Sequence, residues 1–134
     1  MTRRVVLYID SLKTGGAERV TLLLARWFAE EGWQVTVLTR KGESCDFYPV
    51  PAGVVRAVEQ KDQFWLRNVS LLRFPLRLLR LRAWLRRHQP DLVLGMTTLP
   101  AIKLLLAVRG MACPCIVSER NFPPLKRPGL PWRL

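Results

Sequence analysis

Short, nearly continuous apolar runs alternate along this chain with longer segments in which apolar residues recur every three or four positions. The first run covers residues 5–9 (Val-Val-Leu-Tyr-Ile), and comparable runs follow at residues 34–39, 90–95 and 114–118. Strands that are apolar at almost every position are typical of a parallel sheet whose two faces are both covered by helices. The pattern therefore predicts an α/β fold, with a parallel sheet between helices.

The segment between the first two runs predicts a helix. Its apolar residues fall at helical spacing and are expected to form one stripe against the sheet: Val20, Leu23, Leu24, Trp27 and Phe28. Glu18 lies in the first turn, where the helix dipole favours a negative charge, and Gly32 follows the last turn, where glycine commonly ends a helix. Strand, helix, glycine and strand together predict one right-handed βαβ unit.

Turn residues separate the later elements. Val54 to Val58 predicts a short third strand, and a long helix is expected to begin near Pro75, since proline is tolerated in the first turn of a helix. Residues 101–108 predict another short helix, which Gly110 ends.

The long helix has two different faces. Its leucine-rich stripe, expected to cover the sheet, consists of Leu71, Phe74, Leu78, Leu81 and Leu85. The opposite stripe is basic and consists of Arg73, Arg77, Arg80 and Arg87, with Trp84 among them. Two interpretations of these arginines stay open. They form a solvated face, or they face a membrane and rest on anionic lipid, where each cation contributes about 1 kcal/mol.

The Gly15-Gly16 pair lies where the first strand crosses to the first helix. Ligands of open α/β folds collect at such crossings, and glycine lets backbone amides approach an anion that a side chain would keep away. A tight turn without any ligand is the alternative for a bare glycine pair.

Other polar residues follow the later strands and are expected at the same edge of the sheet, because parallel strands end on one side. They are Thr97 and Thr98 after the fourth strand, and Glu119, Arg120 and Asn121 after the fifth. This set suits a phosphate-bearing, hydroxyl-rich ligand. The G-x-G-x-x-G and G-x-x-x-x-G-K-[ST] motifs are absent, and Ser118 lacks the G-x-S-x-G motif of hydrolases.

The positive net charge of the chain indicates an anionic binding partner. The 134 residues contain 22 Lys and Arg against 10 Asp and Glu, a formal net charge of +12. A phosphate-bearing ligand, an acidic membrane surface or nucleic acid would each fit that charge. Nucleic acid fits least well of the three, since basic and aromatic residues do not interleave as they do on a nucleic-acid surface.

The cysteines and the lengths of the apolar segments indicate where in the cell the protein is located. Cys45, Cys113 and Cys115 have no zinc-binding spacing, so no metal site is predicted and the thiols are expected to stay reduced. The first apolar run is too short for a signal peptide, and no window approaches the roughly 20 apolar residues of a spanning helix. The expected location is the cytoplasm, or the inner face of the cell membrane as a peripheral protein.

The order of motifs along the chain is distinctive. An apolar strand precedes Ser-Leu-x-x-Gly-Gly-Ala-Glu-Arg-Val, which starts at Ser11, and the leucine-rich helix that follows ends in Glu-Gly-Trp-Gln-Val-Thr-Val-Leu-Thr. Residues 90–94 and then residues 116–121 come later in matching strand order. In these features the chain resembles the amino-terminal domain of the family 4 glycosyltransferases, over roughly residues 4–124.

The resemblance implies a hexosyltransferase-type enzyme of GT-B architecture, in which two Rossmann-like domains face each other across a cleft. Such enzymes transfer a sugar from a nucleotide-sugar to a glycan or lipid-linked acceptor with retention of configuration, usually without an essential metal, and no cofactor is expected. Gly15 and Gly16 would lie against the donor diphosphate. Glu119, Arg120, Asn121, Thr97 and Thr98 would border the acceptor side of the cleft. Some members have a histidine in the loop of Thr97, and this chain has none there, so no catalytic residue is assigned.

The resemblance also implies a truncated protein. Residues 1–124 are expected to form an incomplete Rossmann-like domain, the amino-terminal half of a GT-B architecture, and the Pro/Gly-rich residues 125–134 to lead into a missing carboxyl-terminal half. The chain is expected to be inactive alone. The alternative function is a non-catalytic basic α/β module that binds an anionic membrane or another polyanion.

Overall fold

The computed structural model describes residues 2–59 and 70–118, with only the backbone described for Cys45 and residues 70–74. The elements in chain order are β1 (Arg4–Ile9), α1 (Gly16–Glu30), β2 (Gln34–Thr39), the 3-10 turn η1 (Glu43–Cys45), β3 (Val54–Val58), α2 (Ser70–His88), β4 (Leu92–Met96), α3 (Thr98–Ala107) and β5 (Cys115–Ser118). The predicted βαβ unit and third strand are confirmed.

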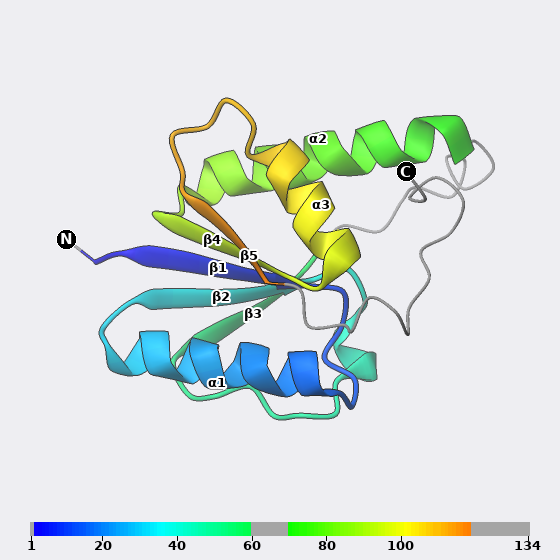
Figure 1. Ribbon diagram of the computed structural model, residues 1–134. Helices are drawn as coiled ribbons and strands as arrows, with labels where there is room; N and C mark the ends of the chain where they lie inside the picture. The colour runs from blue at the N-terminus through cyan, green and yellow to red at the C-terminus, as the bar shows by residue number, and fades with distance from the viewer. Residues whose placement is uncertain (1, 60–69, 119–134) are drawn as a thin grey trace.

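The strands form one parallel sheet in the order β3-β2-β1-β4-β5 (Figure 1). β1 is central, with Val5 paired to Val35 on one side and to Leu92 on the other. All five residues from Val5 to Ile9 are buried, because helices cover both faces of this strand. The chain winds from β1 toward β2 on one side and returns to β4 on the other, so a topological switch point lies between β1 and β4.

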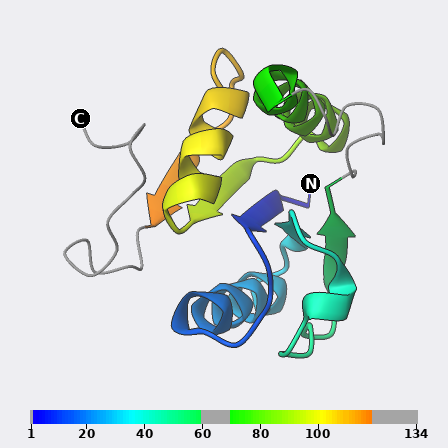
Figure 2. The ribbon, with the colours of Figure 1, turned by 90° about the vertical axis from the view of Figure 1, so that its right-hand side faces the viewer.

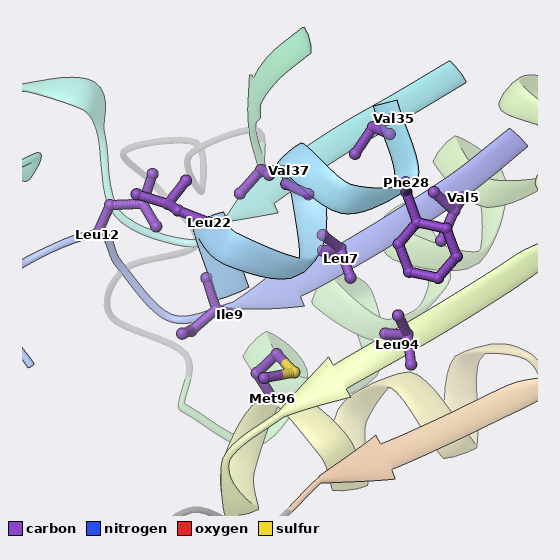
Figure 3. Packing of buried hydrophobic residues seen from close by; sticks show 11 residues of the cluster. Val5, Leu7, Ile9, Leu12, Leu22, Phe28, Val35, Val37, Leu94 and Met96 are labelled. Atoms are coloured by element: carbon purple, nitrogen blue, oxygen red, sulfur yellow. The ribbon is translucent and has the colours of Figure 1, made fainter. Parts of the chain in front are cut away.

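Helix α1 packs on one face of the sheet (Figures 1 and 3). Leu22, Ala25 and Phe28 are its buried apolar residues, and Figure 3 shows Leu22 and Phe28 beside strand residues of β1 and β2. The predicted stripe is wrong for two residues, since Leu23 is 56% and Trp27 is 52% exposed. Residues 22–24 are three consecutive leucines, so periodicity did not fix which of them would face the sheet.

Helices α2 and α3 cover the other face. Leu81 and Leu85 of α2 are buried against the sheet and Leu78 is partly buried, as the leucine stripe predicted; Leu71 and Phe74 lie outside the described side chains. The predicted start of the helix is wrong, because α2 begins at Ser70 and encloses Pro75. A proline near the start of a helix removes a single backbone hydrogen bond, which the packing of α2 on the sheet offsets.

Strand β4 and helix α3 approach each other closely at Gly95. A Cβ atom at Gly95 would lie 2.9 Å from the Cα atom of Ala101. We expect Gly95→Ala to lower the free energy of unfolding by about 1–3 kcal/mol, since the helix must move away from the sheet. Urea unfolding of the purified protein would measure the loss. Gly42→Ala is the control, because the nearest atom to a Cβ there, Ser44 Oγ, is 4.0 Å away; equal losses for the two variants would contradict the close approach.

Candidate functional site

The carboxyl-terminal ends of the strands face the viewer in Figure 2, with the start of α1 on one side of the sheet and the start of α3 on the other. Gly15 and Gly16 lie where the loop after β1 enters α1, and Thr97 and Thr98 lie where the turn after β4 enters α3. The fold therefore brings the two predicted groups to one edge, on either side of the switch point. Open α/β sheets bind their ligands at this position.

Gly16 starts α1 and leaves space around the amino end of the helix. Its backbone is exposed, and a Cβ atom there would have no neighbour within 4 Å. No side chain caps the helix, so the first-turn N–H groups are available to an anion. At Gly15 the situation differs, because a Cβ atom would collide with the carboxylate of Glu18. The Glu18 carboxylate therefore lies close against Gly15.

Thr97 has an unusual backbone conformation. Its φ of 69° and ψ of 172° lie in a region that glycine adopts readily and a β-branched residue almost never does. Two hydrogen bonds hold it there, from Thr97 N to the Ser118 carbonyl at 2.8 Å and from Ala101 N to the Thr97 carbonyl at 3.1 Å. Strain of about 1–3 kcal/mol at one residue is typical of functional sites. The strain supports the predicted functional role of this turn. No sequence signal marks the strain itself.

Asp10 links the ends of β1 and β2. Its Oδ1 lies 2.6 Å from Arg40 Nε and its Oδ2 lies 3.7 Å from Lys41 Nζ. Partial burial acts to raise the pKa of Asp10, but the hydrogen bond and charge of Arg40 outweigh it and lower the pKa below its usual value. The Asp10 carboxylate therefore stays charged and forms ion pairs with Arg40 and Lys41 at this edge of the sheet. Sequence reasoning missed the cluster, although an acidic residue after one buried strand and Arg-Lys after its neighbour could have indicated it.

A second polar cluster is buried under α3. The Tyr8 hydroxyl donates a hydrogen bond to Glu59 Oε1, and Lys103 Nζ lies 2.7 Å from Glu59 Oε2. The Lys103 ammonium also lies 5.7 Å from the centre of the Tyr8 ring. Burial, followed by the Glu59 charge, raises the pKa of Tyr8 far above its usual value, so the phenol stays protonated and donates. The cluster joins β1, the end of β3 and α3.

The remaining predicted residues fall in different places. Glu119, Arg120 and Asn121 lie outside the described residues, and so does the side chain of Arg73. Arg77, Arg80 and Arg87 line a small pocket beside α2, on the face of the sheet opposite to α1. These three arginines of the predicted basic stripe therefore lie on one face of α2.

Two further features concern metals and membranes. Within residues 2–59 and 70–118, no three His, Cys, Asp or Glu side chains come together as metal ligands would. Cys113 and Cys115 are free thiols, and burial raises the pKa of each. Among the helices of the described ranges, none combines the length and the apolarity needed to cross a membrane.

Comparison with known proteins adds to this geometry. Residues 14–134 match the model of the family described as Glycosyltransferase Family 4. The structure is similar to MurG from Acinetobacter baumannii, which has the GT-B fold, with a TM-score of 0.64 over 89% of this chain at 17% identity. It is also similar to the carboxyl-terminal domain of the PF1911 hydrogenase from Pyrococcus furiosus, with a TM-score of 0.53 over 87% of this chain at 16% identity.

The extents of these matches differ. The chain spans 36% of the length of MurG and 90% of the hydrogenase domain. No curated protein matches the sequence. At these identities the structural likeness concerns the fold, whereas the family match extends from the glycine loop to the end of the chain.

Proposed function

Because this chain belongs to Glycosyltransferase Family 4, we propose that it is the acceptor-side domain of a retaining glycosyltransferase. The predicted family is confirmed by the match over residues 14–134, and the Rossmann-like fold of a GT-B half by the similarity to MurG. The proposed enzyme transfers a hexose from a nucleotide-sugar to a glycan or lipid-linked acceptor. The observation that carries the proposal is the family match that begins at the glycine loop, together with the open amino end of α1 at the switch point.

The proposed role of the loop follows from charge. When the bond between sugar and diphosphate breaks, negative charge grows on the departing diphosphate. First-turn N–H groups and the positive end of the α1 dipole stabilise such a charge without rearranging. Gly16 allows the phosphate to reach the backbone, and Glu18 moves aside as the donor binds. We propose that the reaction uses no metal or other cofactor.

The acceptor is proposed to lie near the turn after β4. Thr97 and Thr98 place hydroxyl groups at the start of α3, where they could exchange hydrogen bonds with sugar hydroxyls or donate them to phosphate oxygens. We propose the same role for Glu119, Arg120 and Asn121, which follow β5. The basic residues of α2 would hold the protein at the inner face of an anionic membrane, close to a lipid-linked acceptor.

The whole protein that contains this chain provides the test. We expect it to transfer sugar from one member of a panel of nucleotide-sugars to a polyprenyl-phosphate-linked acceptor, with the product anomer, determined by NMR, matching that of the donor. We expect the 134-residue chain alone to show no transfer, since it spans about a third of the MurG length. A whole protein that binds anionic vesicles but transfers none of the sugars would favour the non-catalytic membrane-binding module instead. An inverted anomer would contradict the retaining mechanism.

A further inference from the structure

Lys103 lies in the second turn of α3, and its side chain is buried. Its ion-pair partner, Glu59, follows β3, which belongs to the other half of the sheet. Lys103 Nζ and Glu59 Oε2 are 2.7 Å apart, and the two side chains are 10% and 12% exposed. Figure 2 shows α3 and β3 on opposite sides of the central strand β1. The ion pair therefore links α3 to the far half of the sheet, across the switch point between β1 and β4.

Tyr8 of β1 fixes the carboxylate of this pair. Its hydroxyl donates a hydrogen bond to Glu59 Oε1, and the Lys103 ammonium lies 5.7 Å from the centre of its ring. Tyr8 is 1% exposed, so the surrounding core holds the phenol in place. Because both carboxylate oxygens have a partner, Glu59 holds the Lys103 ammonium at one position over the sheet.

The first turn of α3 joins Lys103 to the strained turn after β4. Ala101 packs so closely on Gly95 that a Cβ atom at Gly95 would lie 2.9 Å from Ala101 Cα. The Ala101 N–H donates a hydrogen bond to the Thr97 carbonyl oxygen at 3.1 Å. Lys103 follows Ala101 by two residues, and a helix moves as a unit over so short a distance. A displacement of the helix at Lys103 is therefore passed to Thr97 and Thr98.

We propose that Lys103 is a positioning residue of the acceptor site, because its ion pair with Glu59 holds the amino end of α3 in place. The inference rests on the proposed function, in which Thr97 and Thr98 contact the acceptor. The unfavourable backbone conformation of Thr97 persists only where its surroundings hold it. The close contact with β4 fixes α3 on one side, and the ion pair fixes it in the direction across the sheet. Hydroxyl groups held in this way bind a sugar acceptor without first being ordered.

The double variant Lys103→Met/Glu59→Gln of the whole protein tests the proposal, since it removes the ion pair and leaves no unpaired buried charge. We expect the KM for a polyprenyl-phosphate-linked acceptor to rise about tenfold, as for one misplaced hydrogen bond, and kcat and the KM for the nucleotide-sugar to change less than about twofold. Steady-state kinetics well below the unfolding midpoint would measure all three. Hydrogen exchange at the Ala101 amide, which reports opening of the first turn, should become faster.

The double variant Asp46→Asn/Arg56→Met is the matched control. Asp46 and Arg56 form another buried ion pair, with side chains 17% and 8% exposed, and it joins β3 to the residue after η1 rather than to α3. The control should lower the stability to a similar extent and leave the acceptor KM unchanged. An equal rise of the acceptor KM in both double variants would overturn the proposal, since a general loosening of the domain would then explain it.

Tyr8→Phe is a milder variant, which keeps the test valid even where Lys103→Met/Glu59→Gln does not fold. It removes only the hydroxyl that orients Glu59, so the acceptor KM should rise about threefold. An unchanged acceptor KM in a protein that still transfers sugar would overturn the proposal. A wild-type protein without transfer would contradict the proposed function instead. Amide exchange then decides whether the ion pair holds the turn: faster exchange at Ala101 supports this role, and unchanged exchange overturns it.

Discussion

Replacing Gly16 with valine should lower the rate of sugar transfer by the whole protein by about 100-fold, the order expected when a reacting group is displaced by about 1 Å. The valine side chain would stand between the donor diphosphate and the amino end of α1. The fold should be unaffected, because no atom lies within 4 Å of the position of a Cβ at Gly16. Steady-state kinetics and nucleotide-sugar affinity would measure the loss.

Gly16→Ala is the matched control for this variant. Alanine is a better helix residue than glycine by up to about 1 kcal/mol, so Gly16→Ala should raise the unfolding midpoint while it lowers transfer less than valine does. Stability and activity would then change in opposite directions. If both variants retained full transfer and full donor affinity, the proposed contact between the loop and the diphosphate would be wrong.

Replacing Lys103 with methionine should lower the free energy of unfolding by about 3 kcal/mol, a large share of the stability of a domain of this size. The side chains of Lys103 and Glu59 are 10% and 12% exposed, so little water reaches the pair. The variant leaves the Glu59 carboxylate buried with the Tyr8 hydroxyl as its hydrogen-bond partner in the cluster. Urea unfolding followed by circular dichroism would measure the change.

The double variant Lys103→Met/Glu59→Gln separates the causes of that loss. A neutral glutamine can still accept the hydrogen bond from Tyr8, so the double variant should regain most of the stability that Lys103→Met loses. A loss in the double variant as large as in the single one would place its cause in the packing of α3. A loss below about 0.5 kcal/mol in the single variant would be typical of a solvent-screened surface pair.

Most of the fold could be predicted from the pattern of apolar residues. Continuous apolar runs identified the strands, because a strand between two layers of helices is buried on both sides. Gly32 and Gly110 ended their helices as expected, and both have the positive φ that glycine permits. The start of α2 was misplaced, since a proline near a helix start is compatible with two starting positions and tertiary packing decides between them.

The glycine loop and the turn after β4 were both predicted at one sheet edge, because chain order and parallel strands are enough to place them there. The strained backbone of Thr97 and the buried cluster of Tyr8, Glu59 and Lys103 could not be predicted, and the Asp10 ion pairs were missed. Each depends on residues 21 to 95 positions apart that only the completed sheet brings into contact.

The sequence by itself determined the class of fold and the family, because both reside in local patterns: apolar runs, helical spacing and the glycine motif. Only the tertiary structure decided which leucine of α1 faces the sheet and where the arginines of α2 point. A helical stripe specifies that its residues share a face, but the direction of that face depends on the packing of the helix. The α2 arginines consequently line a pocket with Glu59, a residue that precedes them by 18 or more positions.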